Sequence, residues 1–151
     1  TMPTIDVVSD ASVVLKWFHA EGEEEVEPAR ALLDHYRDQR IALHVLDLTP
    51  YEVGNALLRG RAKIDADRVA IVLEALAEIC PQIAPTSSEL REAAILAERH
   101  GLPLYDAAYA AVAQSRGATL ATLDRALLKS ELGQRPSAIT GALTDDQASS
   151  G

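Results

Sequence analysis

Four acidic residues stand at points of the sequence where their side chains could act together. They lie in the segments VVSDAS, PYEVGNAL, YDAAYAAVA and LATLD and are Asp10, Glu52, Asp106 and Asp124. Carboxylates that share one crevice repel one another, and some of them stay protonated at neutral pH unless a cation neutralises them. Oxygen ligands without Cys or His suit Mg²⁺ or Mn²⁺ better than Zn²⁺. The residue types therefore point to metal-dependent phosphoryl transfer or phosphodiester hydrolysis.

Strand-like and helical segments alternate along the chain, which is typical of a parallel sheet with helices on both faces. We predict strands at residues 4–9, 41–45, 82–84 and 118–121, and a last edge strand at residues 137–140. We predict helices at residues 11–18, 28–40, 49–60, 86–100, 105–116 and 124–132, with one more that begins at Asp65. The helix at residues 86–100 begins with a capping box formed by Thr86 and Glu89 and ends at Gly101.

The predicted fold class is α/β, a three-layer α/β/α sandwich with a short, mainly parallel sheet. In such sheets, ligands bind outside the carboxyl ends of the strands, and all four acids fall there. Each acid also has a structural interpretation: Glu52 could complete a capping box with Thr49, Asp106 could favour the dipole of its helix, and Asp124 could cap the next one. Asp10, directly after a near-continuous apolar strand, is the hardest to explain in this way.

Length and composition indicate one globular domain, which we place at residues 2–143, followed by a disordered tail at 144–151. The chain has 151 residues, 48% of them hydrophobic, and a net charge of −9, which argues against non-specific coating of nucleic acid. Aromatic residues make up only 4%, which argues against a platform for base stacking. No apolar run approaches the ~20 residues of a membrane span, and the lone Cys80 fits a reducing compartment. We expect a cytoplasmic protein without membrane contact.

The four acid-bearing segments, in this order, resemble those of PIN-domain ribonucleases, and specifically the VapC toxins of bacterial VapBC toxin–antitoxin systems. The resemblance runs from about Ile5 to Leu128. It implies a PIN-like fold and a metal-dependent endoribonuclease that uses Mg²⁺ or Mn²⁺ and forms no covalent intermediate. It also implies that Asp10 and Asp106 are the acids most directly associated with the metal. By the same resemblance, Glu52 and Asp124 complete the pocket, orienting water or holding a second metal.

The resemblance also implies partners. The substrate would be RNA, and a cognate VapB-type antitoxin would neutralise the toxin of this type II pair. The amphipathic helices around residues 57–76 correspond to the pair that receives the antitoxin in the family, and another part of the surface forms a homodimer. Operator DNA would be met only indirectly, through the antitoxin.

Three polar residues match positions that support the acids in the family. Ser12 and Thr122 stand beside the first and last acids, where a hydroxyl can hold a carboxylate or a water molecule at the metal. A helix cap for Ser12 and a strand-end filler for Thr122 are the structural alternatives. Asn55 lies three residues after Glu52 and so faces the same side of its helix, where it either lines the pocket or bonds to backbone.

Four basic residues are candidates for RNA contacts: Lys16, Arg59, Arg61 and Lys63. The family often carries a basic residue and an aromatic where Lys16 and Trp17 stand, although a core Trp with a solvated Lys is the simpler interpretation. The other three belong to the densest basic stretch of the chain and could position a phosphate backbone. Interleaved acidic residues make a solvated face the alternative there.

Other functions share part of this pattern. A phosphatase-type hydrolase also places an Asp after its first strand, but it needs a second acid two residues later, where Ser12 stands. A phospho-accepting receiver domain needs a pair of adjacent acids, and Asp10 stands alone. A different Mg²⁺-dependent phosphohydrolase, or a catalytically silent PIN-like module that only binds a partner protein, is therefore the alternative to a nuclease.

Overall fold

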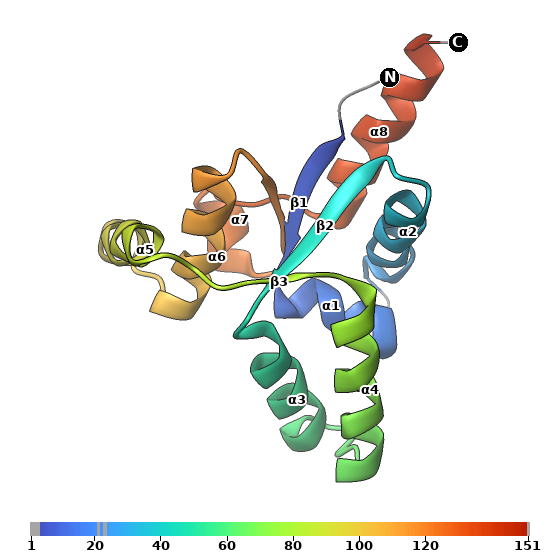
Figure 1. The fold of residues 1–151 in the computed structure, drawn as a ribbon, viewed down its shortest axis with the longest axis vertical. Helices are drawn as coiled ribbons and strands as arrows, with labels where there is room; N and C mark the ends of the chain where they lie inside the picture. The colour runs from blue at the N-terminus through green and yellow to red at the C-terminus, as the bar shows by residue number, and fades with distance from the viewer. Residues whose placement is uncertain (1–3, 21, 23, 151) are drawn as a thin grey trace.

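The computed structural model describes residues 4–20, 22 and 24–150, and within them a four-stranded sheet forms the centre of the molecule. Its strands are β1 (Ile5–Ser9), β2 (Ile41–Leu46), β3 (Gln82–Ile83) and β4 (Thr119–Ala121), in the order β3-β2-β1-β4. Every neighbouring pair is parallel, so the carboxyl ends of the strands meet at one edge of the sheet (Figure 1). The predicted parallel α/β sandwich is confirmed.

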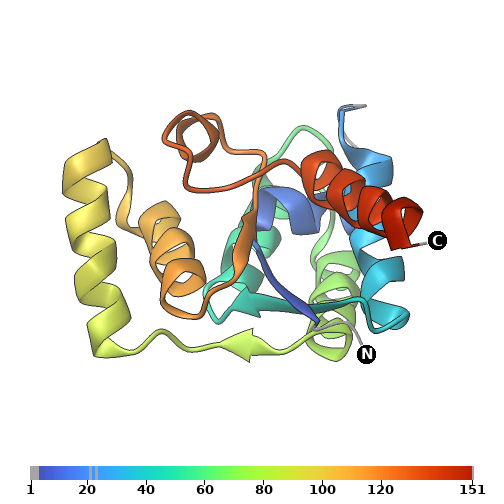
Figure 2. The ribbon, with the colours of Figure 1, turned by 90° about the horizontal axis from the view of Figure 1, so that it is seen from above.

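Helices cover both faces of this sheet (Figure 2). One face carries α5 (Ser87–His100) and α6 (Leu104–Ser115), and the other carries α1 (Ala11–Phe18), α2 (Val26–Arg37) and α8 (Pro136–Ser150). A hairpin of α3 (Thr49–Arg59) and α4 (Ala66–Ile79) extends from the carboxyl edge of the sheet, and the short α7 (Arg125–Lys129) follows β4 (Figure 1). Within the described residues, no helix is both long and apolar enough to cross a bilayer.

Successive side chains of β1 point to opposite faces of the sheet, and the core is divided into two layers. Val7 packs into the cluster formed with α1, α2 and the α3–α4 hairpin, and Val8 packs into the cluster formed with α5 and α6. The buried side of α6 is made largely of alanine, and these small side chains let the helix approach both the sheet and α5 closely. Because α6 carries Asp106 in its first turn, this close packing also fixes the position of that acid.

Local signals set most helix ends where the sequence predicts them. The Asp65 side chain accepts a hydrogen bond from the Arg68 backbone N–H at the start of α4. The capping box of α5 is complete, since Thr86 and Glu89 each accept a bond from the other's backbone N–H. Gly101 ends α5 with a φ of 66°, a left-handed conformation that glycine adopts without strain.

The predicted edge strand at residues 137–140 is wrong, because this segment belongs to α8. Pro136 suits the first turn of a helix, where its missing N–H has no intrahelical partner. Ile139 and Leu143, one turn apart, are both buried in the cluster that contains α2. The structure also continues α8 through Ser150, in the segment for which we predicted disorder, while residue 151 lies outside the described residues.

Candidate active site

Asp10 follows β1 directly and caps α1, so a strand and a helix together fix its position. Its side chain is only 5% exposed. Oδ1 accepts hydrogen bonds from the Ser12 hydroxyl (2.5 Å) and the Val13 backbone N–H (3.3 Å), and Oδ2 accepts one from the Thr122 hydroxyl (2.5 Å). Burial raises the pKa of Asp10 to about 6, and the nearby Glu52 carboxylate adds to the rise, although the three hydrogen bonds oppose it.

The two hydroxyls that hold Asp10 also hold the loop after β4. The Ser12 hydroxyl accepts a bond from the Leu123 backbone N–H, and the Thr122 hydroxyl accepts one from the Asp124 backbone N–H, both at 2.9 Å. Ser12 and Thr122 therefore hold a carboxylate, which is one of the roles that the resemblance to PIN-domain ribonucleases implies for them. Through these bonds the segment that carries Asp124 is fixed directly to the Asp10 carboxylate, across the β1–β4 pair.

Thr122→Val tests this arrangement as a change in stability. Valine keeps the shape of the fully buried side chain but leaves Asp10 Oδ2 and the Asp124 N–H without their partner. We expect the free energy of unfolding to fall by about 1–3 kcal/mol, the cost of unsatisfied buried polar groups. Chemical denaturation at pH 7 measures this. Thr122→Ser keeps the hydroxyl and is the control, and an equal loss in both variants would contradict the assignment.

Glu52 does not cap its helix, so the structural alternative for this residue is wrong. Leu48 is the residue at the helix start and makes no side-chain cap, while Glu52 Oε1 accepts a hydrogen bond from the Tyr109 hydroxyl at 2.7 Å. The Tyr109 oxygen also lies 2.7 Å from the Thr49 hydroxyl, which accepts from the Leu46 backbone N–H at 3.0 Å. Because Tyr109 gives its one proton to Glu52, the Thr49 hydroxyl donates to Tyr109.

The sequence prediction assigned no role to Tyr109 or to the Thr49 hydroxyl in this chain of bonds. Tyr109 is only 1% exposed, and it stands three residues after Asp106 on α6. Residues at that spacing share a face of a helix, so the motif YDAAY held a usable signal for Tyr109. The sequence signal for Thr49 was weaker, because a threonine at the start of a helix more often caps that helix.

Electrostatic interactions connect the four acids in a series. Burial raises the pKa of Glu52, and the Asp106 carboxylate raises it further. Burial likewise raises the pKa of Asp106, with a further contribution from Asp124. Together with the effect of Glu52 on Asp10, these interactions place all four carboxylates within one negatively charged region at the carboxyl edge of the sheet.

Asp106 and Asp124 also serve the structure, as the alternatives suggested, and so does Asp10 by capping α1. Asp124 caps α7 through its bond from the Leu127 backbone N–H at 3.0 Å, and Asp106 lies in the first turn of α6, where a carboxylate favours the helix dipole. These roles hold the side chains in place and are compatible with a second role toward a ligand. Asn55, also in α3, is exposed, and its side chain makes no hydrogen bond within the described part of the chain.

The predicted basic contacts lie at different distances from the acids. Lys16 donates to the Gly22 carbonyl at 3.1 Å and lines a hollow of about 330 Å³ together with Ser12, which bonds to Asp10. Its neighbour Trp17 is buried and donates to the Ala29 carbonyl, as a core tryptophan does.

The other three candidates are not brought to the acids. Arg59, Arg61 and Lys63 are exposed at the tip of the α3–α4 hairpin, which points away from the sheet (Figure 1). Seven residues of helix separate Arg59 from Glu52, or about 10 Å along the axis. These three basic residues, which are close together in the sequence, therefore form a surface that is separate from the four acids.

The donor chemistry of the site fits a hard divalent cation, because all four candidate ligands are carboxylates. Within the described residues, no three Asp, Glu, His or Cys side chains are already grouped closely enough to hold a metal. Burial and neighbouring carboxylates raise the pKa values of Asp10, Glu52 and Asp106. A bound cation would stabilise the ionised form of each carboxylate. Small side-chain movements toward a shared cation would thus be favoured electrostatically.

Comparison with known proteins identifies the family of this chain. The sequence profile of the family described as PIN domain matches residues 7–130. The chain belongs to the PIN-domain family. This PIN domain is 37% identical over 125 residues to "Ribonuclease VapC3" of Pyrobaculum aerophilum, covering 80% of this chain and 91% of that protein. It is also 37% identical over 102 residues to "Exonuclease VapC9" of the same organism, covering 65% of this chain and 76% of the relative.

Solved structures show the same fold. The crystal structure of PAE2754 from Pyrobaculum aerophilum superposes on this PIN domain with a TM-score of 0.63 at 27% identity, covering 93% of this chain and 96% of that one. The Mycobacterium tuberculosis toxin VapC20, described as cleaving the sarcin–ricin loop, superposes with a TM-score of 0.60 at 16% identity, covering 78% of this chain and 89% of that one. The second likeness is evidence for the fold alone.

Proposed function

We propose that this PIN domain is a metal-dependent endoribonuclease and acts as the toxin of a type II toxin–antitoxin pair. The observation that carries the proposal is the convergence of Asp10, Glu52, Asp106 and Asp124, from four separate segments, at the carboxyl edge of the sheet. Helix capping does not require four carboxylates to lie close enough to repel one another, whereas a metal-dependent nuclease uses such a cluster. The relatives named ribonuclease and exonuclease support hydrolysis of nucleic acid as the reaction.

Asp10 and Asp106 are proposed to hold Mg²⁺ or Mn²⁺, and Glu52 and Asp124 to complete the site. When bound, such a cation neutralises phosphate charge and makes water a better nucleophile at neutral pH. Ser12 and Thr122 orient the Asp10 carboxylate, and Tyr109 orients Glu52. The scissile phosphate enters where these carboxylates meet, and the protein supplies no covalent nucleophile.

The proposal extends to partners. A cognate VapB-type antitoxin would neutralise the toxin, and operator DNA would be reached only through it. The α3–α4 hairpin, which carries the exposed Leu58 and Ile71, is the proposed antitoxin-binding region. We further propose a homodimer that acts in the cytoplasm.

Cleavage of RNA by the purified protein tests the proposed reaction directly. We expect discrete cuts in total cellular RNA with Mg²⁺ or Mn²⁺, and their loss when EDTA removes the metal. A circular RNA that contains the identified site separates two modes of action. An endonuclease linearises the circle, whereas an exonuclease, the activity named for one relative, requires a free end.

Each outcome decides between the candidate functions. Cuts that persist in EDTA would contradict the role of the acids as metal ligands. Degradation restricted to linear RNA would mean that the protein is an exonuclease and not an endonuclease. Absence of both cleavage and calorimetric Mg²⁺ binding would favour a silent protein-binding module.

A further inference from the structure

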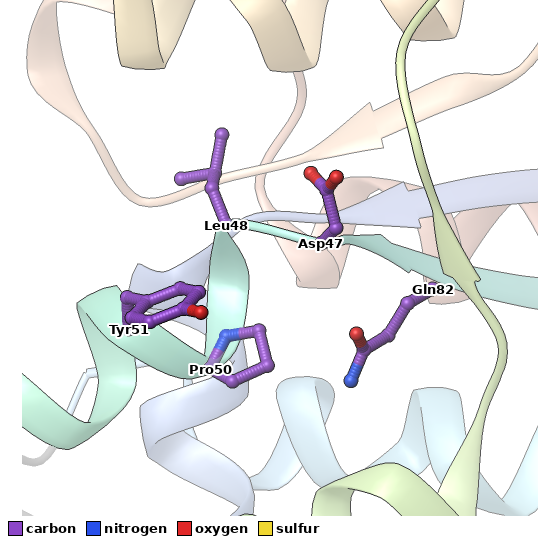
Figure 3. Close-up of a pocket in the computed structure, with 5 residues that line it drawn as sticks. All are labelled: Asp47, Leu48, Pro50, Tyr51 and Gln82. Atoms are coloured by element: carbon purple, nitrogen blue, oxygen red, sulfur yellow. The ribbon is translucent and has the colours of Figure 1, made fainter.

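The strands differ in how closely later parts of the chain approach their carboxyl ends. At the end of β2 a hollow of about 560 Å³ stays open, and Figure 3 shows the side chains of Asp47 and Tyr51 at this hollow pointing to different sides. At the end of β4, the segment at residues 132–135 returns after α7 and packs directly against Thr122. Because the Thr122 hydroxyl bonds to Asp10, this second contact bears on the candidate active site.

Backbone hydrogen bonds fix the returning segment beside β4. The Thr122 N–H donates to the Gln134 carbonyl at 3.0 Å, and the Gln134 N–H donates to the Leu120 carbonyl at 2.8 Å. The two bonds form a parallel bridge between Ala121 and Gln134. The segment therefore cannot move away from β4 without losing both of them.

Gly133 lies where this segment meets the Thr122 side chain. A β-carbon at residue 133 would lie 2.5 Å from the Thr122 methyl carbon and 3.1 Å from the Leu120 carbonyl oxygen. Non-bonded carbon atoms are normally about 3.5–4.0 Å apart, so the first distance leaves no room for a side chain. The backbone itself does not require glycine here, because Gly133, unlike Gly101, has no positive φ. The space beside Thr122 is therefore the reason for the glycine.

The Thr122 side chain cannot give way to a β-carbon without moving its hydroxyl. The side chain is fully buried, and its methyl and hydroxyl groups share one β-carbon, so a rotation that moves the methyl also moves the hydroxyl. That hydroxyl donates to Asp10 Oδ2 and accepts from the Asp124 N–H. A side chain at residue 133 would thus act on the carboxylate of Asp10 through Thr122.

We propose that Gly133 is a positioning residue of the active site: by leaving room for the Thr122 methyl, it keeps the Thr122 hydroxyl on Asp10. Gly133 has no functional group and lies beyond α7, outside the four acid-bearing segments, so it acts only through the space that it leaves. The inference rests on the proposed nuclease function and adds to it a residue that sets the geometry of a metal ligand.

Gly133→Ala tests the proposal with two measurements. In the metal-free protein, NMR hydrogen exchange of the Asp124 amide reports its bond to the Thr122 hydroxyl, and we expect exchange to become about tenfold faster, the factor for loss of one hydrogen bond. Calorimetry reports Mg²⁺ binding, and we expect the dissociation constant to rise about tenfold, as for other groups that orient a metal ligand.

Thr122→Ser provides a rescue, because serine keeps the hydroxyl and lacks the methyl that the new β-carbon would meet. The double variant Gly133→Ala/Thr122→Ser should therefore match Thr122→Ser alone in both measurements. If Gly133→Ala does not fold, the double variant decides. A folded double variant with these values supports the proposal, and one that also fails to fold overturns it.

Gly141→Ala in α8 is the matched control, because an added β-carbon there meets nothing within 4 Å beyond the backbone of its own helix. It should leave Asp124 exchange and Mg²⁺ affinity unchanged. Wild-type values of both quantities in folded Gly133→Ala overturn the proposal. A double variant that folds but resembles Gly133→Ala also overturns it, since the conflict would then not involve the Thr122 methyl.

The two measurements separate this inference from the proposed function. If the wild type binds no Mg²⁺ and cuts no RNA while Asp124 exchange responds as expected, the nuclease is removed and Gly133 still positions Thr122. If the wild type cuts RNA with Mg²⁺ and Gly133→Ala binds Mg²⁺ equally well, the nuclease stands and the positioning role is removed.

Discussion

Asp10→Asn is expected to abolish hydrolysis and, at the same time, to stabilise the metal-free protein. The substitution removes the negative charge of a proposed metal ligand and keeps its size. Loss of a group that merely orients a ligand typically costs 10–100-fold, so we expect RNA cleavage to fall by at least about a hundredfold. The initial rate of cleavage in Mg²⁺, compared with the wild type, measures the effect. Activity within tenfold of the wild type would contradict the assignment of Asp10.

The stability of the same variant follows from the pKa of Asp10, which rises from 3.8 to about 6 on folding. An acid whose pKa is raised by folding binds more protons in the folded state, so stability falls as the pH rises from about 4 to about 6 and is constant above. At pH 7 the ionised carboxylate costs roughly 1–3 kcal/mol, and Asn avoids this cost. Denaturation in EDTA should therefore show a more stable variant at pH 7 and a smaller difference at pH 4.

Mg²⁺ provides the internal control for this result. Bound cation stabilises the wild type by mass action and should bring little stability to Asp10→Asn. If the variant gains as much from Mg²⁺ as the wild type does, Asp10 is not a metal ligand.

Tyr109→Phe is expected to weaken metal binding without unfolding the protein. The substitution removes the buried hydroxyl that donates to Glu52, while Thr49 keeps its bond from the Leu46 N–H. Glu52 then loses its fixed orientation, and the groups that orient ligands contribute about 10–100-fold to metal affinity or activity. We expect the Mg²⁺ concentration for half-maximal cleavage to rise by that order, as a metal titration of the rate would show.

Tyr36→Phe is the matched control for this prediction. Tyr36 lies in α2, and its hydroxyl makes no hydrogen bond within the residues that the structure describes. Its removal should leave the Mg²⁺ titration unchanged. A similar shift in both variants, or none in Tyr109→Phe, would mean that the hydroxyl does not position Glu52.

The sequence was sufficient to predict the fold class and the edge at which the acids gather. Alternating strand and helix patterns imply a parallel sheet, and the carboxyl edge of such a sheet brings Asp10 and Asp124 together without any local motif. The resemblance to PIN-domain ribonucleases pointed to Ser12 and Thr122, and in the structure both donate hydrogen bonds to Asp10. The fold class follows from a general rule of topology, whereas these two residues came from their match to a known family.

What the sequence could not supply depends on contacts between distant residues. Tyr109 and Glu52 are 57 residues apart, and nothing in a single sequence pairs a buried hydroxyl with one carboxylate over another. Arg59, Arg61 and Lys63 were candidates because they form a dense basic stretch of the sequence, but α3 carries Arg59 about 10 Å along its axis from Glu52. The edge strand at 137–140 was misassigned because Ile139 packs through helical rather than strand spacing, a choice made by tertiary contact with α2.

The Thr122–Asp10 hydrogen bond joins residues 112 positions apart, and it has a consequence for how the protein is made. During translation, Asp10 is made long before β4, Thr122 and Asp124, so the nascent chain lacks one wall of the site while the intervening residues are added. A chain proposed to cut RNA is thus assembled on a messenger RNA by a ribosome made largely of RNA. The position of β4 in the sequence delays the completion of the site until the chain has been extended from Asp10 through Asp124.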